Sequence, residues 1–243
     1  MKIVVVKNYE EVSLKAAQFM AEIVNNKPEA VLGLATGGTP VGMYENLIKM
    51  NKDGKVDFSK VTSVNLDEYV GLSGEHKKSY RFFMNDTLFN HINIDKARTF
   101  VPNGLAKDIE AECLAYDHRI VELGGIDLQL LGLGGNGHIA FNEPDSHLVV
   151  GSHLTGLTKD TIDANARFFK NASEVPQTAV TMGLGGIMQA KKILLIASGE
   201  GKAEAVQSMM NGKITADCPA SMLQMHRDVT IIIDEAAAAK ISK

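Results

Sequence analysis

Short, continuous apolar runs that alternate with longer helical patterns constrain the fold of this chain more than any other feature. The runs occupy residues 3–6, 30–34, 61–66, 128–133, 193–197 and 229–233. One helical pattern repeats its apolar residues at three- and four-residue spacings: Ile109, Cys113, Tyr116, Ile120 and Leu123. This alternation predicts an open α/β fold, with a mostly parallel sheet, helices on both faces and right-handed crossovers. Cys113 is then a core residue.

The alternation extends over all 243 residues without an internal repeat or a linker rich in proline and serine. We therefore expect a single α/β domain over residues 1–243. The least periodic region covers residues 145–176. Because a loop-rich insertion of this length is often functional, we predict a lid or binding segment there.

Charge and cysteine content exclude several classes of protein. Lys and Arg number 25 against 29 Asp and Glu, a net charge of −4, and no basic tail is present, so we expect no nucleic-acid partner. No apolar run approaches the ~18–20 residues of a membrane span, and no leader precedes the first run. Cys113 and Cys218 form no C-x-x-C pair. We expect a soluble, cytoplasmic protein without a membrane partner.

The stretch LGLGGNGHIAFNEP, residues 131–144, contains the G-x-G-x-x-G pattern of dinucleotide-binding turns. A dinucleotide site also needs a helix directly after the glycines. Here the chain continues with His138 and Glu143, and Pro144 breaks any helix that has begun. The sequence therefore favours acid–base chemistry on a loop after a strand over an NAD site.

Two further loops after predicted strands suit anions. Thr36-Gly-Gly-Thr-Pro40 combines glycines, hydroxyls and a proline before a helix that begins near Val41, which is typical of a phosphate site and also of an ordinary capped turn. Ser198-Gly-Glu-Gly-Lys202 adds a cation but lacks the first glycine of a nucleotide-triphosphate loop. Because parallel sheets bind ligands beyond the carboxyl ends of their strands, we predict a small monophosphate at this edge.

Candidate acid–base residues occupy the same edge. Asp67 and Glu68 directly follow a predicted strand, so at least one carboxylate should reach the crevice, although both can also be solvated loop charges. His138 supplies an imidazole, the side chain suited to proton transfer near neutral pH, and Glu143 five residues later can fix its tautomer.

Metal and serine chemistry fit less well. The spacings of His138, Glu143, His147 and His153 match no zinc pattern, so we expect no metal. No G-x-S-x-G occurs, which argues against a serine hydrolase.

The assembled motifs resemble the glucosamine-6-phosphate deaminases, of the short, non-allosteric type. The matching segments are LATGGTP at 34–40, NLDEYVGL at 65–72, GGNGHIAFNEP at 134–144, NARFF at 165–169 and SGEGKA at 198–203. The resemblance implies conversion of glucosamine 6-phosphate and water to fructose 6-phosphate and ammonia, with no metal or organic cofactor. It also implies a Rossmann-like fold similar to ribose-5-phosphate isomerase and 6-phosphogluconolactonase.

The resemblance also implies roles for individual residues. Asp67 would move a proton between C2 and C1 of the sugar, and His138 would open the ring with the help of Asn136 and Glu143. The residues implied to bind the phosphate are Gly37, Gly38, Thr39, Arg167 and Lys202.

Three departures concern regulation. Asn136 stands where the allosteric branch carries Asp, and residues 150–152 read Val-Gly-Ser where the family usually reads Ser-Arg-Thr. The chain ends soon after an expected helix at 235–243, without the C-terminal segment of the allosteric hexamers. Effector control and hexamer assembly are therefore in doubt, and a monomer and a small homo-oligomer both stay open. The alternatives are a 6-phosphogluconolactonase and a non-catalytic sugar-phosphate sensor.

Overall fold

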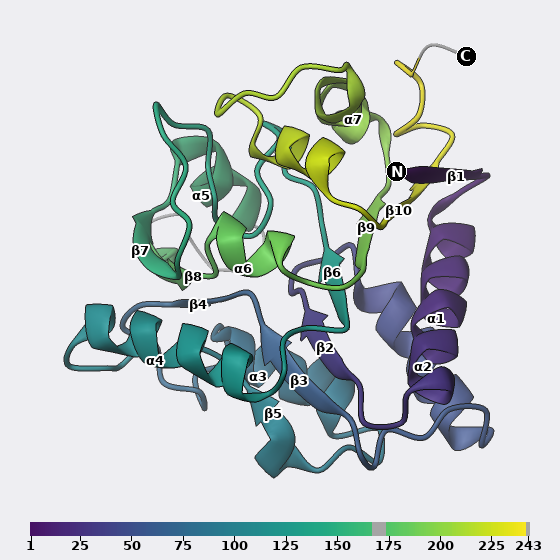
Figure 1. The fold of residues 1–243 in the computed structure, drawn as a ribbon, viewed down its shortest axis with the longest axis vertical. Helices are drawn as coiled ribbons and strands as arrows, with labels where there is room; N and C mark the ends of the chain where they lie inside the picture. The colour runs from purple at the N-terminus through teal and green to yellow at the C-terminus, as the bar shows by residue number, and fades with distance from the viewer. Residues whose placement is uncertain (167–173, 242–243) are drawn as a thin grey trace.

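A seven-stranded parallel sheet forms the centre of the protein (Figure 1). The computed structural model describes residues 1–166 and 174–241. The strands are β1 Lys2–Val6, β2 Val31–Leu34, β3 Thr62–Asn65, β5 Thr99–Phe100, β6 Leu128–Leu131, β9 Ile193–Ala197 and β10 Val229–Asp234. Their order is β1-β10-β9-β6-β2-β3-β5, and all neighbours run parallel.

The predicted α/β class is confirmed, because each of the six apolar runs overlaps a strand of this sheet. The central strands β9 and β10 are buried along their whole length, as expected for strands covered on both faces. From β2 the chain moves outward through β3 and β5, and it then returns to β6 on the other side of β2. The direction of winding thus reverses between β2 and β6, where open α/β sheets bind their ligands.

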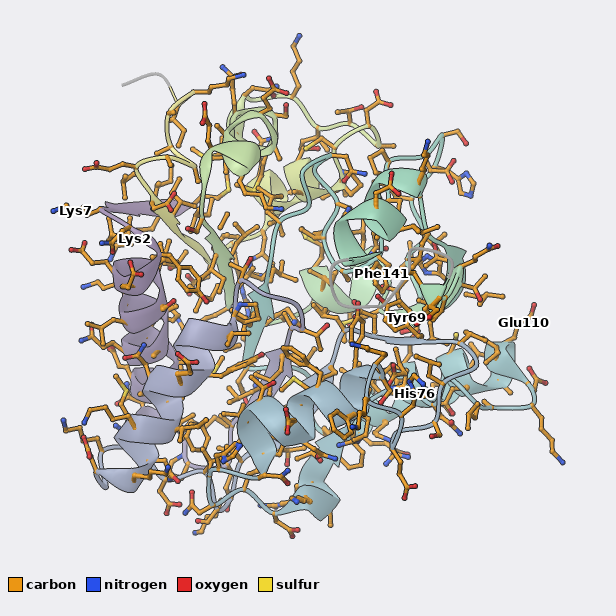
Figure 2. All side chains as sticks on the ribbon, turned by 180° about the vertical axis from the view of Figure 1, so that it is seen from behind. Lys2, Lys7, Tyr69, His76, Glu110 and Phe141 are labelled. Atoms are coloured by element: carbon orange, nitrogen blue, oxygen red, sulfur yellow. The ribbon has the colours of Figure 1, made fainter. Side chains whose placement is uncertain are left out.

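A second, antiparallel sheet has the order β4-β8-β7, from Asp67–Tyr69, Thr178–Thr181 and His153–Gly156. Asp67 therefore opens a strand and does not lie on a free loop after the 61–66 run. The chain changes sheets there because the amide of Met182 donates to the Leu66 carbonyl at 2.7 Å and Asp67 pairs with Thr181. Tyr69 and Phe141 pack in a separate small core beside this sheet (Figure 2).

Helices cover the central sheet, with α1 and α2 to one side of the strands and α6 to the other (Figure 1). The α-helices are α1 Tyr9–Asn26, α2 Val41–Lys52, α3 Tyr80–Met84, α4 Ile109–Glu122, α5 Lys159–Ala166, α6 Leu184–Met188 and α7 Ala203–Met210. Helix α4 confirms the helical pattern of the sequence, and Cys113 is buried on it. Within the described ranges no helix combines the length and apolar character needed to cross a membrane.

Shorter helices complete the chain: a π-helix at Asn85–Phe89 and 3₁₀-helices at Lys96–Arg98, Glu200–Lys202 and Pro219–Met225. The helix expected at 235–243 is wrong, since residues 235–240 form turns. The Asp234 carboxylate holds the first of these turns by accepting the Ala237 amide at 2.8 Å, and it also accepts the Ser198 hydroxyl and the Gly199 amide. The predicted lid region includes β7 and α5 in its described part, and its lid role stays a prediction.

Candidate active site

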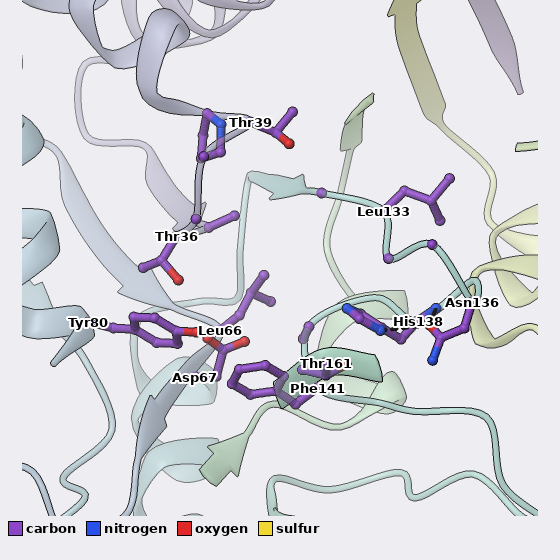
Figure 3. A pocket seen from close by; sticks show the side chains of 18 of the residues that line it. Thr36, Thr39, Leu66, Asp67, Tyr80, Leu133, Asn136, His138, Phe141 and Thr161 are labelled. Carbon is purple, nitrogen blue, oxygen red and sulfur yellow. Dashed lines mark hydrogen bonds between the residues drawn. The ribbon is translucent and has the colours of Figure 1, made fainter. Parts of the chain in front are cut away.

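A cavity of about 350 Å³ lies where the winding of the sheet reverses, as the sequence predicts for the ligand site (Figure 3). The segments that follow β2, β3 and β6 line the cavity just beyond the carboxyl ends of these strands. Helix α3, helix α5 and the Glu200–Lys202 helix each add one residue. Of the predicted site residues, those that line the cavity are Gly37, Gly38, Thr39, Asp67, Asn136, His138 and Lys202. Residues far apart in the sequence thus line the same cavity.

The turn between β2 and α2 forms one end of the cavity. Gly37 has a φ of +92°, a left-handed conformation that an L side chain would strain. The Tyr9 hydroxyl accepts the Gly42 amide at 2.8 Å and donates to the Gly38 carbonyl at 3.2 Å, which fixes the turn from outside. The turn therefore presents its backbone and the start of α2 to the cavity, an arrangement that favours an anion.

Lys202 brings a cation to the same cavity. The turn before it is tied down, because the Asp234 carboxylate accepts the Ser198 hydroxyl at 2.5 Å and the Gly199 amide at 3.0 Å. Arg167, the other predicted phosphate ligand, lies outside the described residues.

Asp67 is a buried carboxylate in the cavity wall. Burial raises the pKa of Asp67 to about 8, and the negative charge of Glu68 adds to the rise. Glu68 has a different surrounding: its carboxylate accepts backbone amides of Tyr69, Tyr80 and Arg81 at 2.8 to 3.0 Å. Of the two adjacent carboxylates, Asp67 alone faces the cavity, and Glu68 anchors the start of α3.

His138, Asn136 and Glu143 form a hydrogen-bonded group. The Asn136 carbonyl oxygen lies 2.8 Å from His138 Nδ1, and Glu143 Oε2 lies 3.2 Å from the same nitrogen. Both partners are acceptors, so Nδ1 carries the hydrogen and Nε2 is the basic nitrogen. The Asn136 amide nitrogen donates to Glu143 Oε2 at 2.9 Å, which connects the three side chains.

Glu143 lies behind His138 and does not line the cavity. Burial alone would raise the pKa of Glu143, but hydrogen bonds from His138, Thr161 and Asn136 and the charge of His138 lower it to about 2. An ionised Glu143 can stabilise a protonated imidazole, as a histidine that exchanges protons with a substrate requires.

One glycine of the 131–144 stretch, Gly134, makes room for this histidine. A Cβ on Gly134 would lie 2.4 Å from His138 Cε1 and Nδ1, so only glycine leaves room for the ring. No helix follows these glycines before α5, which confirms that the chain lacks the helix of a dinucleotide site. Ala140, at a φ of +52°, is the one non-glycine residue with positive φ among those described, and it also lines the cavity.

Four polar or aromatic residues of the cavity were not among the predicted site residues: Thr36, Tyr80, Phe141 and Thr161. Thr36 and Phe141 belong to quoted motifs, but only the fold assigns their side chains to the wall. The Tyr80 ring packs against Tyr69 at a centroid distance of 4.7 Å and lies beside Asp67 in Figure 3. Tyr80 and Thr161 belong to α3 and α5, which follow strands of the second sheet that the sequence did not predict, so no sequence signal pointed to them.

The four residues considered for zinc are not brought together, since His147 and His153 do not line the cavity. Over residues 1–166 and 174–241, no group of three His, Cys, Asp or Glu side chains has an arrangement that could hold a metal ion.

Comparison with known proteins gives consistent results. The family described as glucosamine-6-phosphate isomerases/6-phosphogluconolactonase matches residues 7–232. A glucosamine-6-phosphate deaminase of Clostridium perfringens (strain 13 / Type A) is 68% identical over 238 residues, covering 98% of each chain. A solved monomeric glucosamine-6-phosphate deaminase superposes with a TM-score of 0.97 at 48% identity, over 99% of this chain and 100% of that one. A 6-phosphogluconolactonase from Leishmania guyanensis, 18% identical with a TM-score of 0.73 over 100% and 99% of the two chains, shares the fold.

Proposed function

The chain belongs to the family of glucosamine-6-phosphate isomerases and 6-phosphogluconolactonases, and from this premise we infer that it converts glucosamine 6-phosphate and water to fructose 6-phosphate and ammonia. It is a hydrolase of amino-sugar catabolism. The observation that carries this function is a single cavity that joins an anion-binding turn, a buried carboxylate and an imidazole backed by a second carboxylate.

The sugar phosphate binds with its phosphate at the turn of Gly37, Gly38 and Thr39, where backbone amides and the start of α2 favour negative charge. Lys202, which lines the same cavity, supplies a counter-charge. Arg167 is a further proposed ligand on the strength of the family resemblance alone. Anchoring the phosphate fixes C1 and C2 of the sugar against the acid–base groups, which lowers the entropic part of the barrier.

His138 opens the ring. Its Nε2 takes the proton of the anomeric hydroxyl and returns a proton to the ring oxygen as the C1–O5 bond breaks, which gives the open aldehyde. Asn136 holds the hydrogen of His138 on Nδ1, and the ionised Glu143 stabilises the imidazolium between the two transfers.

Asp67 then acts as the isomerisation base. Its carboxylate removes the C2 proton, which the aldehyde has acidified, and delivers it to C1. The electron pair of the C2–H bond moves through the enolamine to C1, the aldehyde oxygen gains a proton, the amine loses one, and the nitrogen is left as an imine at C2. Water adds to this imine, the C2–N bond breaks, and ammonia leaves with fructose 6-phosphate. The reaction is redox-neutral, so no step requires a redox cofactor.

We further propose that the enzyme is a cytoplasmic monomer. Support comes from the monomeric state of the 48%-identical relative, from the buried free cysteines Cys113 and Cys218, and from the cellular location of sugar phosphates.

The function is tested by incubating the purified protein with glucosamine 6-phosphate and measuring ammonia and fructose 6-phosphate together. Equal amounts of both products are expected, and N-acetylglucosamine 6-phosphate, which has no free amine, should release neither. Hydrolysis of 6-phosphogluconolactone without ammonia release from the amino sugar would instead support the lactonase of this family.

A further inference from the structure

Helix α5 brings a hydroxyl group to the rear of the ring-opening residues. Thr161 is 4% exposed, lines the cavity, and donates from Oγ1 to Glu143 Oε1 at 2.5 Å. The Thr158 hydroxyl donates to Thr161 Oγ1 at 3.2 Å. Because an ionised carboxylate only accepts, the Thr161 hydrogen must point to Glu143, and the bond from Thr158 supports that direction.

The two oxygens of Glu143 face different elements. Oε2 meets Asn136 and His138, which belong to the same loop as Glu143. Oε1 meets Thr161, which belongs to α5. A carboxylate held at both oxygens cannot turn about its terminal bond, so the Thr161 contact fixes the plane in which Oε2 faces His138.

A separate, apolar contact holds α5 in place. Ile162 packs against the small core that contains Tyr69 and Phe141. Removing the Thr161 hydroxyl while keeping the volume of the side chain should therefore leave the helix docked.

We propose that Thr161 is a positioning residue for ring opening, which holds Glu143 in the orientation that lets it stabilise protonated His138. The inference rests on the proposed function and deepens it. It makes the catalytic group depend on a residue from the region in which the sequence predicts a lid.

The test compares Thr161→Val, which removes the hydroxyl at nearly constant volume, with Thr161→Ser, which keeps it. Losing a hydrogen bond to a charged group should lower kcat for glucosamine 6-phosphate by roughly 10- to 100-fold in Thr161→Val, with KM changed by less than about threefold. Thr161→Ser should stay within about threefold of the wild type. Ile162→Val, which trims the apolar anchor and keeps the hydroxyl, is the matched control and should also stay within about threefold.

A double-mutant cycle shows whether Thr161 acts through Glu143. In a Glu143→Ala background, Thr161→Val should lower kcat by less than about twofold further. Equal losses in both backgrounds, wild-type kcat in Thr161→Val, or an equal loss in Ile162→Val would overturn the proposal. Thr161→Ala gives the same comparison if the valine variant unfolds on circular dichroism. Absence of ammonia release from the wild type would refute the proposed function itself, which is a different result.

Discussion

Replacing Gly134 by alanine should disable ring opening while leaving the fold in place. The added Cβ would lie 2.4 Å from two atoms of the His138 ring, whereas ordinary contact begins near 3.4 Å, so the ring must move by about 1 Å. Such a shift breaks the 2.8 Å contact with Asn136 and the 3.2 Å contact with Glu143. A displacement of about 1 Å at a reacting group can cost about 100-fold in rate, and full loss of a general acid–base costs about 10²–10⁴-fold. We expect kcat to fall by about 10²–10³-fold.

The matched control is Gly156→Ala on β7, because a Cβ there meets no atom within 4 Å and Gly156 does not line the cavity. Its kcat should stay within about threefold of the wild type. The assay is ammonia release from glucosamine 6-phosphate, repeated with an acyclic analogue that lacks the C4 and C5 hydroxyls and so cannot close a ring. Gly134→Ala should process the analogue almost as fast as the wild type. Wild-type kcat on the cyclic substrate in Gly134→Ala would refute the role given to this glycine and to His138.

Four further outcomes are expected. Lys202→Ala should raise KM for glucosamine 6-phosphate by roughly 10- to 100-fold, and the exposed Lys213→Ala should not, as initial-rate kinetics would show. Because Asp67 must be ionised to act as a base and its pKa in the empty site is about 8, kcat/KM should rise with pH up to about 8 and then level off. The pKa of Asp67 is near 4 in the unfolded chain and about 8 in the folded protein, so between these pH values only the folded state holds the Asp67 proton. The free energy of unfolding therefore falls by at most about 1.4 kcal/mol for each unit by which the pH rises. The Tm advantage of Asp67→Asn over the wild type should therefore grow from pH 5 to pH 8. The lowered pKa of Glu143 has the opposite effect on stability. Glu143→Gln should lower Tm at pH 7, and the Tm difference between this variant and the wild type should shrink as pH falls from about 4.5 towards 2.

The strands of the central sheet could be predicted because they are buried on both faces and so read as continuous apolar runs. The 193–197 run coincides with β9, and the 30–34 and 229–233 runs differ from β2 and β10 by one residue at an end. The 61–66 run shows where this signal fails. After Leu66 the chain leaves the central sheet and pairs with β8, which lies more than 110 residues later. No residue near Leu66 indicates this change of sheet.

The site could be predicted wherever a residue directly follows a strand, since the fold alone brings those positions together. This covers Asp67, His138 and the glycine turn after β2. It does not separate Asp67 from Glu68, because adjacent carboxylates look alike in sequence and only the position of α3 decides which one is bound by backbone amides. Tyr80 and Thr161 reach the cavity through packing of distant segments, which a single sequence does not encode locally.

Asp67 and Glu143 show how the surroundings divide the acid–base work between two buried carboxylates. Both lose hydration, but Glu143 accepts hydrogen bonds from His138, Thr161 and Asn136 and its pKa falls to about 2, whereas Asp67 stands next to the charge of Glu68 and its pKa rises to about 8. Glu143 is therefore ionised throughout the cycle and suits a constant electrostatic role beside His138. Asp67 keeps its proton in the empty site at neutral pH, and the ammonium group of a bound amino sugar would supply the counter-charge that favours its ionised form. Binding of the amine and activation of the base are then linked, so the pKa that governs kcat should lie below the value near 8 that governs kcat/KM.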